Sequence, residues 1–323
     1  MIIQFVGPTA YAAGKIWNFN PAILFGDVKL ETPLSTILLQ PVEDADEHYK
    51  QALRLRKLKS ITGTFTVSPK SKDYDFDDLQ NDMSTMWSFF RFVTSVSIGL
   101  GPWISWKTAK KISAIQPDGG SFDPLRRTEN WANFYCNETL PILFENYQTT
   151  CKDADTKDVL HRTFEFYRAS TSARNFAGIE TGIILAQSAL ELLCDFILQR
   201  HAGWSKELTK QAKGFHNRLA ASSTFIGYDG EPLEKSEGVR KHFAKGQALN
   251  DYQILTKVRN SITHALPDPR LSGGELLNIW HASMFLTGLH VFYLLKYSGK
   301  MKDRRQIDGW FGDTIPIPLK AFI

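Results

Sequence analysis

The sequence has little cysteine and no cysteine spacing that is typical of a metal or disulfide site. Its three cysteines are Cys136, Cys151 and Cys194, an odd number without metal-ligand spacing. Cys194 lies in an apolar helical stretch, so we expect a small core residue. The apolar run Met1–Val6 opens the chain without the basic segment of a secretory signal. The cysteine count excludes a disulfide-rich secreted scaffold, and we expect a protein of the reducing cytoplasm.

Motifs of several common enzyme classes are also absent. The sequence contains no Gly-rich phosphate loop of the Walker kind, no His-Glu-x-x-His, no Cys-x-x-Cys and no Gly-x-Ser-x-Gly elbow. These absences argue against P-loop nucleotidases, zinc peptidases of that motif and α/β-hydrolases. The carboxylates within 73–78 lie in a hydrophilic turn and are interpreted as a helix start rather than a metal site. We therefore expect no metal and no other cofactor.

The composition is that of an ordinary globular protein. The chain has 323 residues, 43% apolar and 22% charged, which excludes a disordered chain, a collagen-like fibre and a low-complexity array. Its net charge is only +4, but the charge is uneven. Residues 1–125 carry 13 basic and 13 acidic side chains, whereas residues 200–259 carry 11 and 6. The local surplus indicates either a polyanionic partner or a solvated face.

The first half of the chain has strand-like patterns. Strands are expected at Met1–Val6, Asp27–Leu30, Thr36–Leu39, Ser60–Val67 and Trp103–Ile112. The segment Ile61–Val67 alternates with a period of two, as a half-buried strand does. A helix is expected from about Asp75 to Val93, and Gly99–Pro102 is expected to end it. Because Gln116–Pro124 is the clearest linker, the sequence predicts a β-containing N-terminal domain over residues 1–118.

Nearly everything after this linker has helical spacing. Helices are expected at Glu129–Tyr147, Thr156–Ser170, Asn175–Gln199, Gly246–Ala265 and 275–297. The region 203–240 is less regular and is expected to be a crossover, and Met301–Ile323 an extended segment packed on the surface. The sequence thus predicts an all-α bundle with a tail over residues 125–323. The fold class predicted for the whole chain is α+β.

One stretch is long and apolar enough to suggest a membrane helix. Leu276–Leu295 contains no Asp, Glu, Lys or Arg. His281, His290 and Asn278 interrupt it, and no basic cluster precedes it. We therefore expect a buried helix of the bundle and no membrane partner, with a membrane-associated protein as the alternative. The two histidines are expected in the core or at a dimer interface.

The candidate site lies at the end of the penultimate predicted helix. Arg259, Asn260 and His264 precede Pro267, which forces the helix to end nearby. Histidine can exchange a proton with a ribose 2′-OH or a leaving oxygen near neutral pH, and arginine can hold a phosphate as negative charge develops. The amide of Asn260 can orient either group. This set suits metal-independent cleavage of RNA through its 2′-OH, and local unwinding is expected to bring Arg259 and His264 to one edge.

The arrangement resembles the Arg-polar-x(3–5)-His motif of HEPN domains, the helical bundles of bacterial HEPN ribonucleases. Upstream, Ile179–Leu193 looks like the long early helix of that family, with Glu191 at its acidic position. The resemblance covers about residues 155–300 and implies a homodimer with both motifs in one cleft. It also implies an endoribonuclease that acts on RNA, in a bacterial defence or toxin-like system. Arg259, Asn260 and His264 would be catalytic, and Glu191 supporting.

Other interpretations of the same residues stay open. Cations at a helix C-terminus commonly only stabilise the helix, so the bundle is alternatively a non-catalytic nucleotide-binding, RNA-binding or dimerisation module. Glu191 lies in an apolar helix and is as well explained by a buried ion pair with an arginine. The N-terminal domain carries no catalytic constellation. By analogy with multi-domain HEPN proteins, we expect it to sense or dock a regulatory ligand or protein.

Overall fold

The fold divides into two compact units, Met1–Thr149 and Thr150–Ile323. The computed structural model describes residues 12–17, 27–44, 47, 51, 61–94, 99–108, 111–116, 139–243, 249–264, 271–306 and 314–320. The first unit contains a β-sheet and helices, and the second is mostly helical. This confirms the α+β layout predicted from the sequence.

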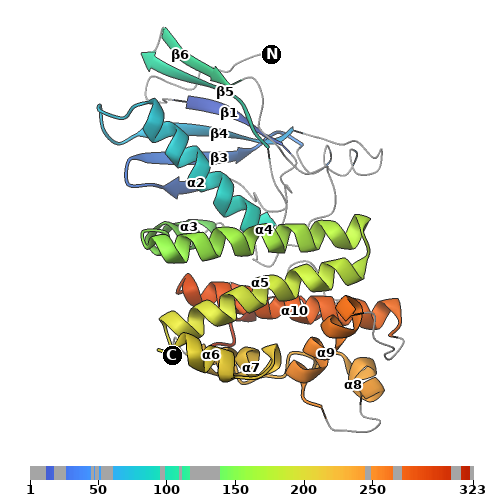
Figure 1. The fold of residues 1–323 in the computed structure, drawn as a ribbon. Coiled ribbons are helices and arrows are strands. Elements are labelled where there is room, and N and C mark those ends of the chain that lie inside the picture. Colours follow the sequence, from blue (N-terminus) through green and yellow to red (C-terminus); the bar gives the residue numbers. More distant parts are fainter. Residues whose placement is uncertain are drawn as a thin grey trace. The chain divides into compact units, whose positions relative to one another are not determined.

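The sheet of the first unit has six antiparallel strands (Figure 1). They are β1 (Ala12–Trp17), β2 (Val28–Glu31), β3 (Ser35–Pro41), β4 (Ile61–Pro69), β5 (Gly99–Thr108) and β6 (Lys111–Gln116), in the spatial order β2-β3-β4-β1-β5-β6. The predictions for β2, β3 and β4 are confirmed. The strand expected at Met1–Val6 lies outside the described residues. Gly99–Pro102 was expected to end a helix, but these residues form the start of β5.

One face of the sheet is apolar because the strands pair in register. Two rows of buried side chains cross β2, β3 and β4: Val28, Leu39 and Phe65, and Leu30, Ile37 and Val67. The side chain of Lys29, between Val28 and Leu30, is exposed. The alternation follows from the two-residue period of a strand.

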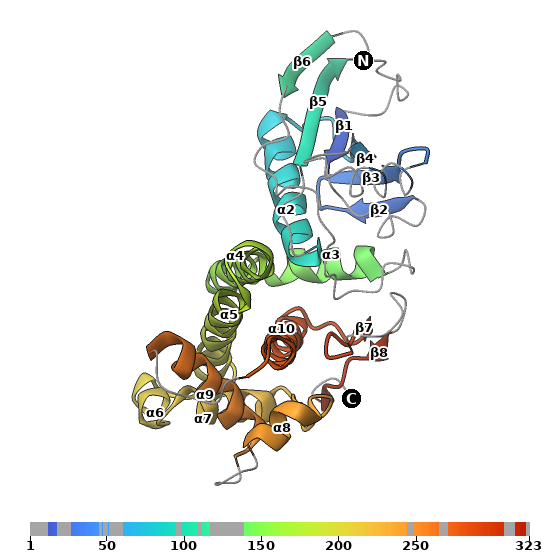
Figure 2. The ribbon, with the colours of Figure 1, turned by 90° about the vertical axis from the view of Figure 1, so that its right-hand side faces the viewer.

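Helix α2 (Phe76–Thr94) lies beside this sheet (Figure 2). Its first turn carries Asp77 and Asp78, where carboxylates complement the helix dipole. One turn further on, the buried Asp82 Oδ2 accepts hydrogen bonds from the hydroxyls of Thr32 (3.1 Å), Ser35 (2.5 Å) and Tyr74 (3.0 Å). The bonds from Thr32 and Ser35 tie α2 to the turn between β2 and β3, and the bond from Tyr74 ties the segment before α2 to the helix. Burial is the largest factor that raises the pKa of Tyr74, and the neighbouring Asp82 adds to it.

Helix α3 (Thr139–Thr150) packs with the first unit. The rings of Phe144 and Phe89 lie 5.2 Å apart, and Gln148 Nε2 donates to the carbonyl of Glu31 at 2.7 Å. The domain limits predicted at residues 118 and 125 lie outside the described residues, so they stay a prediction.

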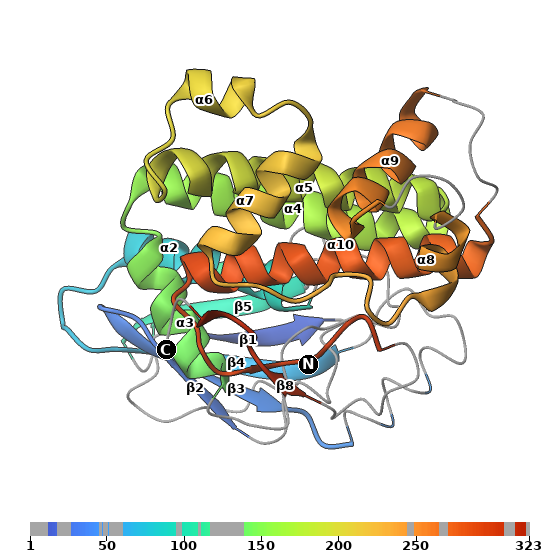
Figure 3. The same ribbon diagram turned by 90° about the horizontal axis from the view of Figure 1, so that it is seen from below.

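The second unit is organised around α5. Its helices are α4 (Ala154–Phe176), α5 (Ile179–Arg200), α6 (Lys206–Gln211), α7 (Phe215–Phe225), α8 (Glu237–Phe243), α9 (Asp251–His264) and α10 (Gly273–Leu294). Helix α5 packs against α4, α7, α9 and α10, and Figures 1 and 3 show these helices around it. The residue before α5 is Gly178, whose φ of 100° is a conformation that favours glycine. The helices expected near 156–170, 175–199, 246–265 and 275–297 are confirmed, although α4 continues to Phe176 and α9 begins only at Asp251.

Two regions of the second unit differ from prediction. The expected irregular crossover contains the three short helices α6, α7 and α8. The tail forms a two-residue ladder between β7 (Lys300–Met301) and β8 (Ile315–Pro316). Asp303 and Arg304, between these strands, are buried, so this part of the tail does not simply lie on the surface.

Helix α10 is buried as predicted, from Ile279 through Phe292, with His281 and His290 in the core. Ser272 and Glu275 form a capping box at its start. Among the described residues, α5 is the one helix long and apolar enough to cross a membrane, and slightly more than half of that stretch is buried. Such a stretch is equally typical of a core helix, which agrees with the position of α5 in the unit.

Candidate functional site

The structure brings two of the predicted site residues into contact. Glu191 lies on α5 and Arg259 on α9, and Arg259 Nη1 donates to Glu191 Oε2 at 2.9 Å. Both side chains are partly exposed, Arg259 at 22% and Glu191 at 31%. The ion pair therefore lies at the edge of the unit and not in its core. At this edge a ligand can compete for the guanidinium of Arg259.

A second arginine, which no motif in the sequence indicates, shares the same carboxylate. Arg218 on α7 donates from Nη2 to Glu191 Oε1 at 2.5 Å and from Nε to Asp195 Oδ1 at 2.7 Å. Glu191 and Asp195 are four residues apart on α5 and share a helix face. Two carboxylates at this spacing in an apolar helix are a signal for paired cations, but the sequence does not say which distant arginine supplies them. We call Glu191, Asp195, Arg218 and Arg259 the arginine–carboxylate cluster.

The floor of this cluster is aromatic. Phe215 is buried at the start of α7, and the guanidinium carbons of Arg259 and Arg218 lie 5.6 Å and 6.0 Å from its ring centroid. Both distances are within reach of a cation–π interaction. Burial raises the pKa of Asp195, and the charge and hydrogen bond of Arg218 offset only part of this rise. The cluster is thus a semi-buried site with one face closed by an apolar ring.

Among the described residues, neither Asn260 nor His264 forms a hydrogen bond with a side chain of this cluster. Both are exposed, and they are four residues apart on one face of α9. The helix continues through His264, so the local unwinding expected to bring Arg259 and His264 together does not occur before His264. Arg259 and His264 therefore keep the angular offset of about 140° that five residues give on an ideal helix. In the part of the chain that the structure describes, no hydrogen bond joins His264 to Arg259, so one copy does not assemble the full predicted site.

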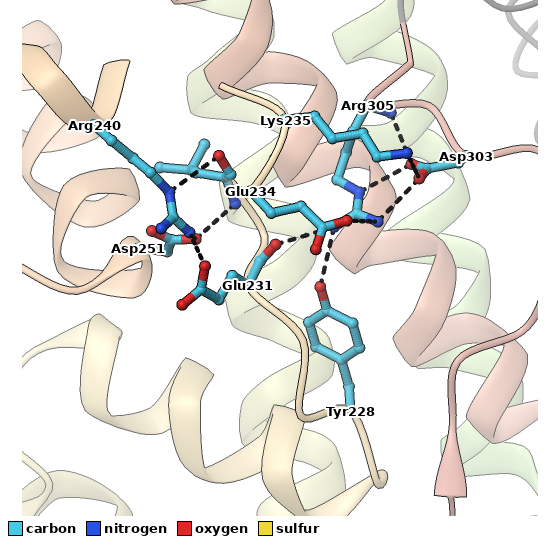
Figure 4. A network of polar contacts seen from close by, with 9 residues as sticks. Tyr228, Glu231, Glu234, Lys235, Arg240, Asp251, Asp303 and Arg305 are labelled. Carbon is cyan, nitrogen blue, oxygen red and sulfur yellow. Dashed lines mark hydrogen bonds and ion pairs between the residues drawn. The ribbon is translucent and has the colours of Figure 1, made fainter. Parts of the chain in front are cut away.

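Part of the basic surplus in residues 200–259 is neutralised by ion pairs. Figure 4 shows the network around Arg240, which donates to Asp251 and Glu231, both at 2.7 Å. In the same network, Arg305 donates to Asp303 at 2.9 Å and to the carbonyl of Glu231 at 3.0 Å. Burial raises the pKa of Asp303, but the hydrogen bonds and charge of Arg305 outweigh it and hold that pKa below its usual range. This network connects α8 and the start of α9 to the tail, and we interpret it as structural.

Three further reactive side chains meet in the core and are sealed from solvent. Ser222 Oγ lies 2.9 Å from both Cys194 Sγ and His290 Nε2, and all three residues are fully buried. Burial lowers the pKa of His290 to about 4, although its hydrogen bond to the Leu286 carbonyl acts in the opposite direction. Burial raises the pKa of the Cys194 thiol. A neutral histidine and an un-ionised thiol without access to substrate do not make a nucleophilic site.

The described residues contain no cluster of metal ligands. No group of three or more His, Cys, Asp and Glu side chains there is placed to hold a metal ion. Cys151 and Cys194 do not form a disulfide. Cys136 lies outside the described residues.

Comparison with known proteins matches the helical unit. Neither a curated protein nor a solved structure matches the chain. A profile of the YopA C-terminal domain family matches residues 153–316, just over half of the chain and almost all of the second unit. The match includes α5, α7 and α9 with the arginine–carboxylate cluster, but the description of the family names no activity. The chain therefore belongs to the YopA C-terminal domain family.

Proposed function

We propose that the helical unit is a metal-independent endoribonuclease of HEPN type that acts as a homodimer. The observation that supports this most is the state of Arg259. Its guanidinium is partly exposed and is held from α5 by Glu191 through Nη1. A guanidinium fixed in this way can bind a phosphate with its remaining N–H groups at little further loss of side-chain entropy.

The proposed reaction needs a base, an acid and a cation. A neutral His264 takes the proton of the ribose 2′-OH, and the 2′-oxygen attacks phosphorus. The bond from phosphorus to the 5′-oxygen breaks while a protonated histidine gives a proton to that oxygen. The products are a 2′,3′-cyclic phosphate and a 5′-hydroxyl. Arg259 stabilises the charge on the phosphoryl oxygens, and Asn260 orients the phosphate or the imidazole.

The homodimer supplies what one copy lacks. One chain offers a single exposed histidine in this motif, and that histidine is about 140° around α9 from Arg259 on an ideal helix. Two copies that place their α9 ends in one cleft would contribute both histidines and both arginines. A size measurement that gives a stable monomer, with and without RNA, would remove the second histidine and with it this mechanism.

The wider setting is proposed by analogy with the HEPN family. We place the protein in the cytoplasm of a bacterium, in a defence or toxin-like system, without a cofactor and without a membrane partner. The first unit would sense or dock a regulatory ligand or protein. Recovery of the protein only in the membrane fraction, and its release only by detergent, would contradict this setting.

A second candidate function is favoured by the ion pairs themselves. Two arginines and two carboxylates balance in charge, and each hydrogen bond among them also stabilises the packing of α5, α7 and α9. The unit would then be a non-catalytic nucleotide-binding, RNA-binding or dimerisation module. This candidate predicts RNA binding or dimerisation without strand cleavage.

Cleavage of RNA in the presence of excess EDTA separates the two candidates. Wild-type protein is expected to cleave single-stranded RNA, whereas His264→Ala is expected to lose activity by at least a hundredfold. His201→Ala is the matched control, because His201 is also an exposed histidine at the C-terminal end of a helix in the same unit. Cleavage by wild type and His264→Ala at the same rate, or no cleavage by either, would contradict the nuclease.

A further inference from the structure

The arginine–carboxylate cluster has an internal order. Each oxygen of Glu191 binds a different guanidinium, Oε1 that of Arg218 and Oε2 that of Arg259. Glu191 therefore links a side chain of α7 to a side chain of α9. Any change in the side-chain rotamer of Glu191 moves the carboxylate oxygen to which Arg259 donates.

Arg218 is the more firmly held of the two arginines. It contacts Glu191 through Nη2 and Asp195 through Nε, so two successive turns of α5 fix its guanidinium. Its side chain is 16% exposed, less than that of Arg259 at 22%. Among the described residues, the hydrogen bonds of Arg259 to carboxylates involve Nη1 alone. Arg218 thus has the contacts of an anchor, whereas Arg259 keeps donors for another ligand.

We infer that Arg218 is the positioning residue of this site: it fixes the rotamer of Glu191, and Glu191 in turn fixes the guanidinium of Arg259. The physical reason is that a partly exposed glutamate with a single counterion can follow that counterion, whereas one held on both oxygens cannot. Asp195 strengthens the effect because it holds Arg218 from the next turn. The meaning of this positioning for catalysis rests on the proposed function, but the positioning itself does not.

The first test measures the position of Arg259 without any RNA. In protein labelled with ¹⁵N in arginine, the Nε–H signal of Arg259 is assigned by its loss in Arg259→Lys. In Arg218→Gln this signal is expected to shift and to show faster rotation of the guanidinium. Arg218→Lys, which keeps the charge and one contact, is expected to lie between wild type and Arg218→Gln. Arg240→Gln is the matched control, since Arg240 also binds two carboxylates in the same unit, and it should leave the signal unchanged.

The second test measures cleavage. Arg218→Gln is expected to lower kcat/KM about tenfold to a hundredfold, the loss that a misplacement of about 1 Å produces. The double variant with Glu191→Gln should lose little more than the larger single variant, because both changes break the same link. Arg218→Lys is expected to recover part of the loss, and Arg240→Gln to retain wild-type kcat/KM with an equal or lower melting temperature.

With these two tests, the inference and the proposed function can each be contradicted independently of the other. A wild-type protein that cleaves no RNA contradicts the nuclease, but the signal of Arg259 in Arg218→Gln still decides the inference. An Arg259 signal that is the same in wild type and Arg218→Gln overturns the inference, even if the protein is a nuclease. Fully additive losses in the double variant overturn it as well.

Discussion

The sealed histidine in the helical unit should make that unit sensitive to mild acid. His290 is fully buried on α10, between the Leu286 carbonyl and Ser222. Its Nδ1 lies 2.8 Å from that carbonyl, which can only accept, so Nδ1 carries the proton and Nε2 accepts from a hydroxyl. The folded protein therefore holds this imidazole in its neutral form, and burial lowers its pKa to about 4.

The sign and size of the pH effect follow from this pKa. The unfolded chain binds the proton near pH 6.5, whereas the folded chain does so only near pH 4. Between these values the unfolded state binds more protons, so the free energy of unfolding falls as the pH falls. The full difference corresponds to about 3 kcal/mol, of which about 2 kcal/mol is lost between pH 7 and pH 5.

Urea unfolding of wild type and His290→Gln at a series of pH values tests this prediction. The variant should be less stable than wild type at pH 7, because it loses packing and hydrogen bonds in the core. Its free energy of unfolding should change less between pH 7 and pH 5, by about 2 kcal/mol, because glutamine does not titrate. The difference between the two profiles isolates His290 from the carboxylates that titrate in both proteins. Parallel profiles over this range would refute the reasoning.

Three further predictions concern single contacts. Asp82→Ala removes the acceptor that three hydroxyls of the first unit share, and it should lower the free energy of unfolding by about 2 kcal/mol in urea; an unchanged midpoint would contradict the role of Asp82. Ser272→Ala removes the capping box of α10 and should lower the free energy of unfolding by about 1 kcal/mol in thermal melts. Ser261→Ala, the same substitution inside α9, should lower it by less. Gly178→Ala places a β-carbon at a φ of 100° and should lower stability by about 1–2 kcal/mol; equal melting temperatures would show that the turn adapts.

The local patterns of the sequence predicted most of the described elements. Ile61–Val67 alternates strictly, and β4 forms over this stretch. The strand β1 was missed because Ala12–Trp17 has few β-branched residues, although it lies in the middle of the sheet. Gly99–Pro102 was misread because glycine and proline usually interrupt elements, whereas here they open the long strand β5.

The sequence predicted only some of the residues of the candidate site. Arg259 and His264 were found because they share a short motif, and Glu191 because it is a charge inside an apolar helix. Arg218 lies 27 residues from Glu191 in the chain, and only the packing of α7 on α5 brings them together. Hydrophobic periodicity indicates the apolar face of each helix but not which helices pack together, so no local pattern predicts this contact.

The nature of the RNA ends is the most direct measurement of the central claim. An RNA oligonucleotide with one cleavage site is incubated with the protein in excess EDTA, beside the same oligonucleotide with a single 2′-deoxy sugar at that site. The account predicts a 2′,3′-cyclic phosphate and a 5′-hydroxyl from the first, and no cleavage at that position in the second. Cleavage of the 2′-deoxy oligonucleotide at the same position, or products with a 5′-phosphate, would contradict it.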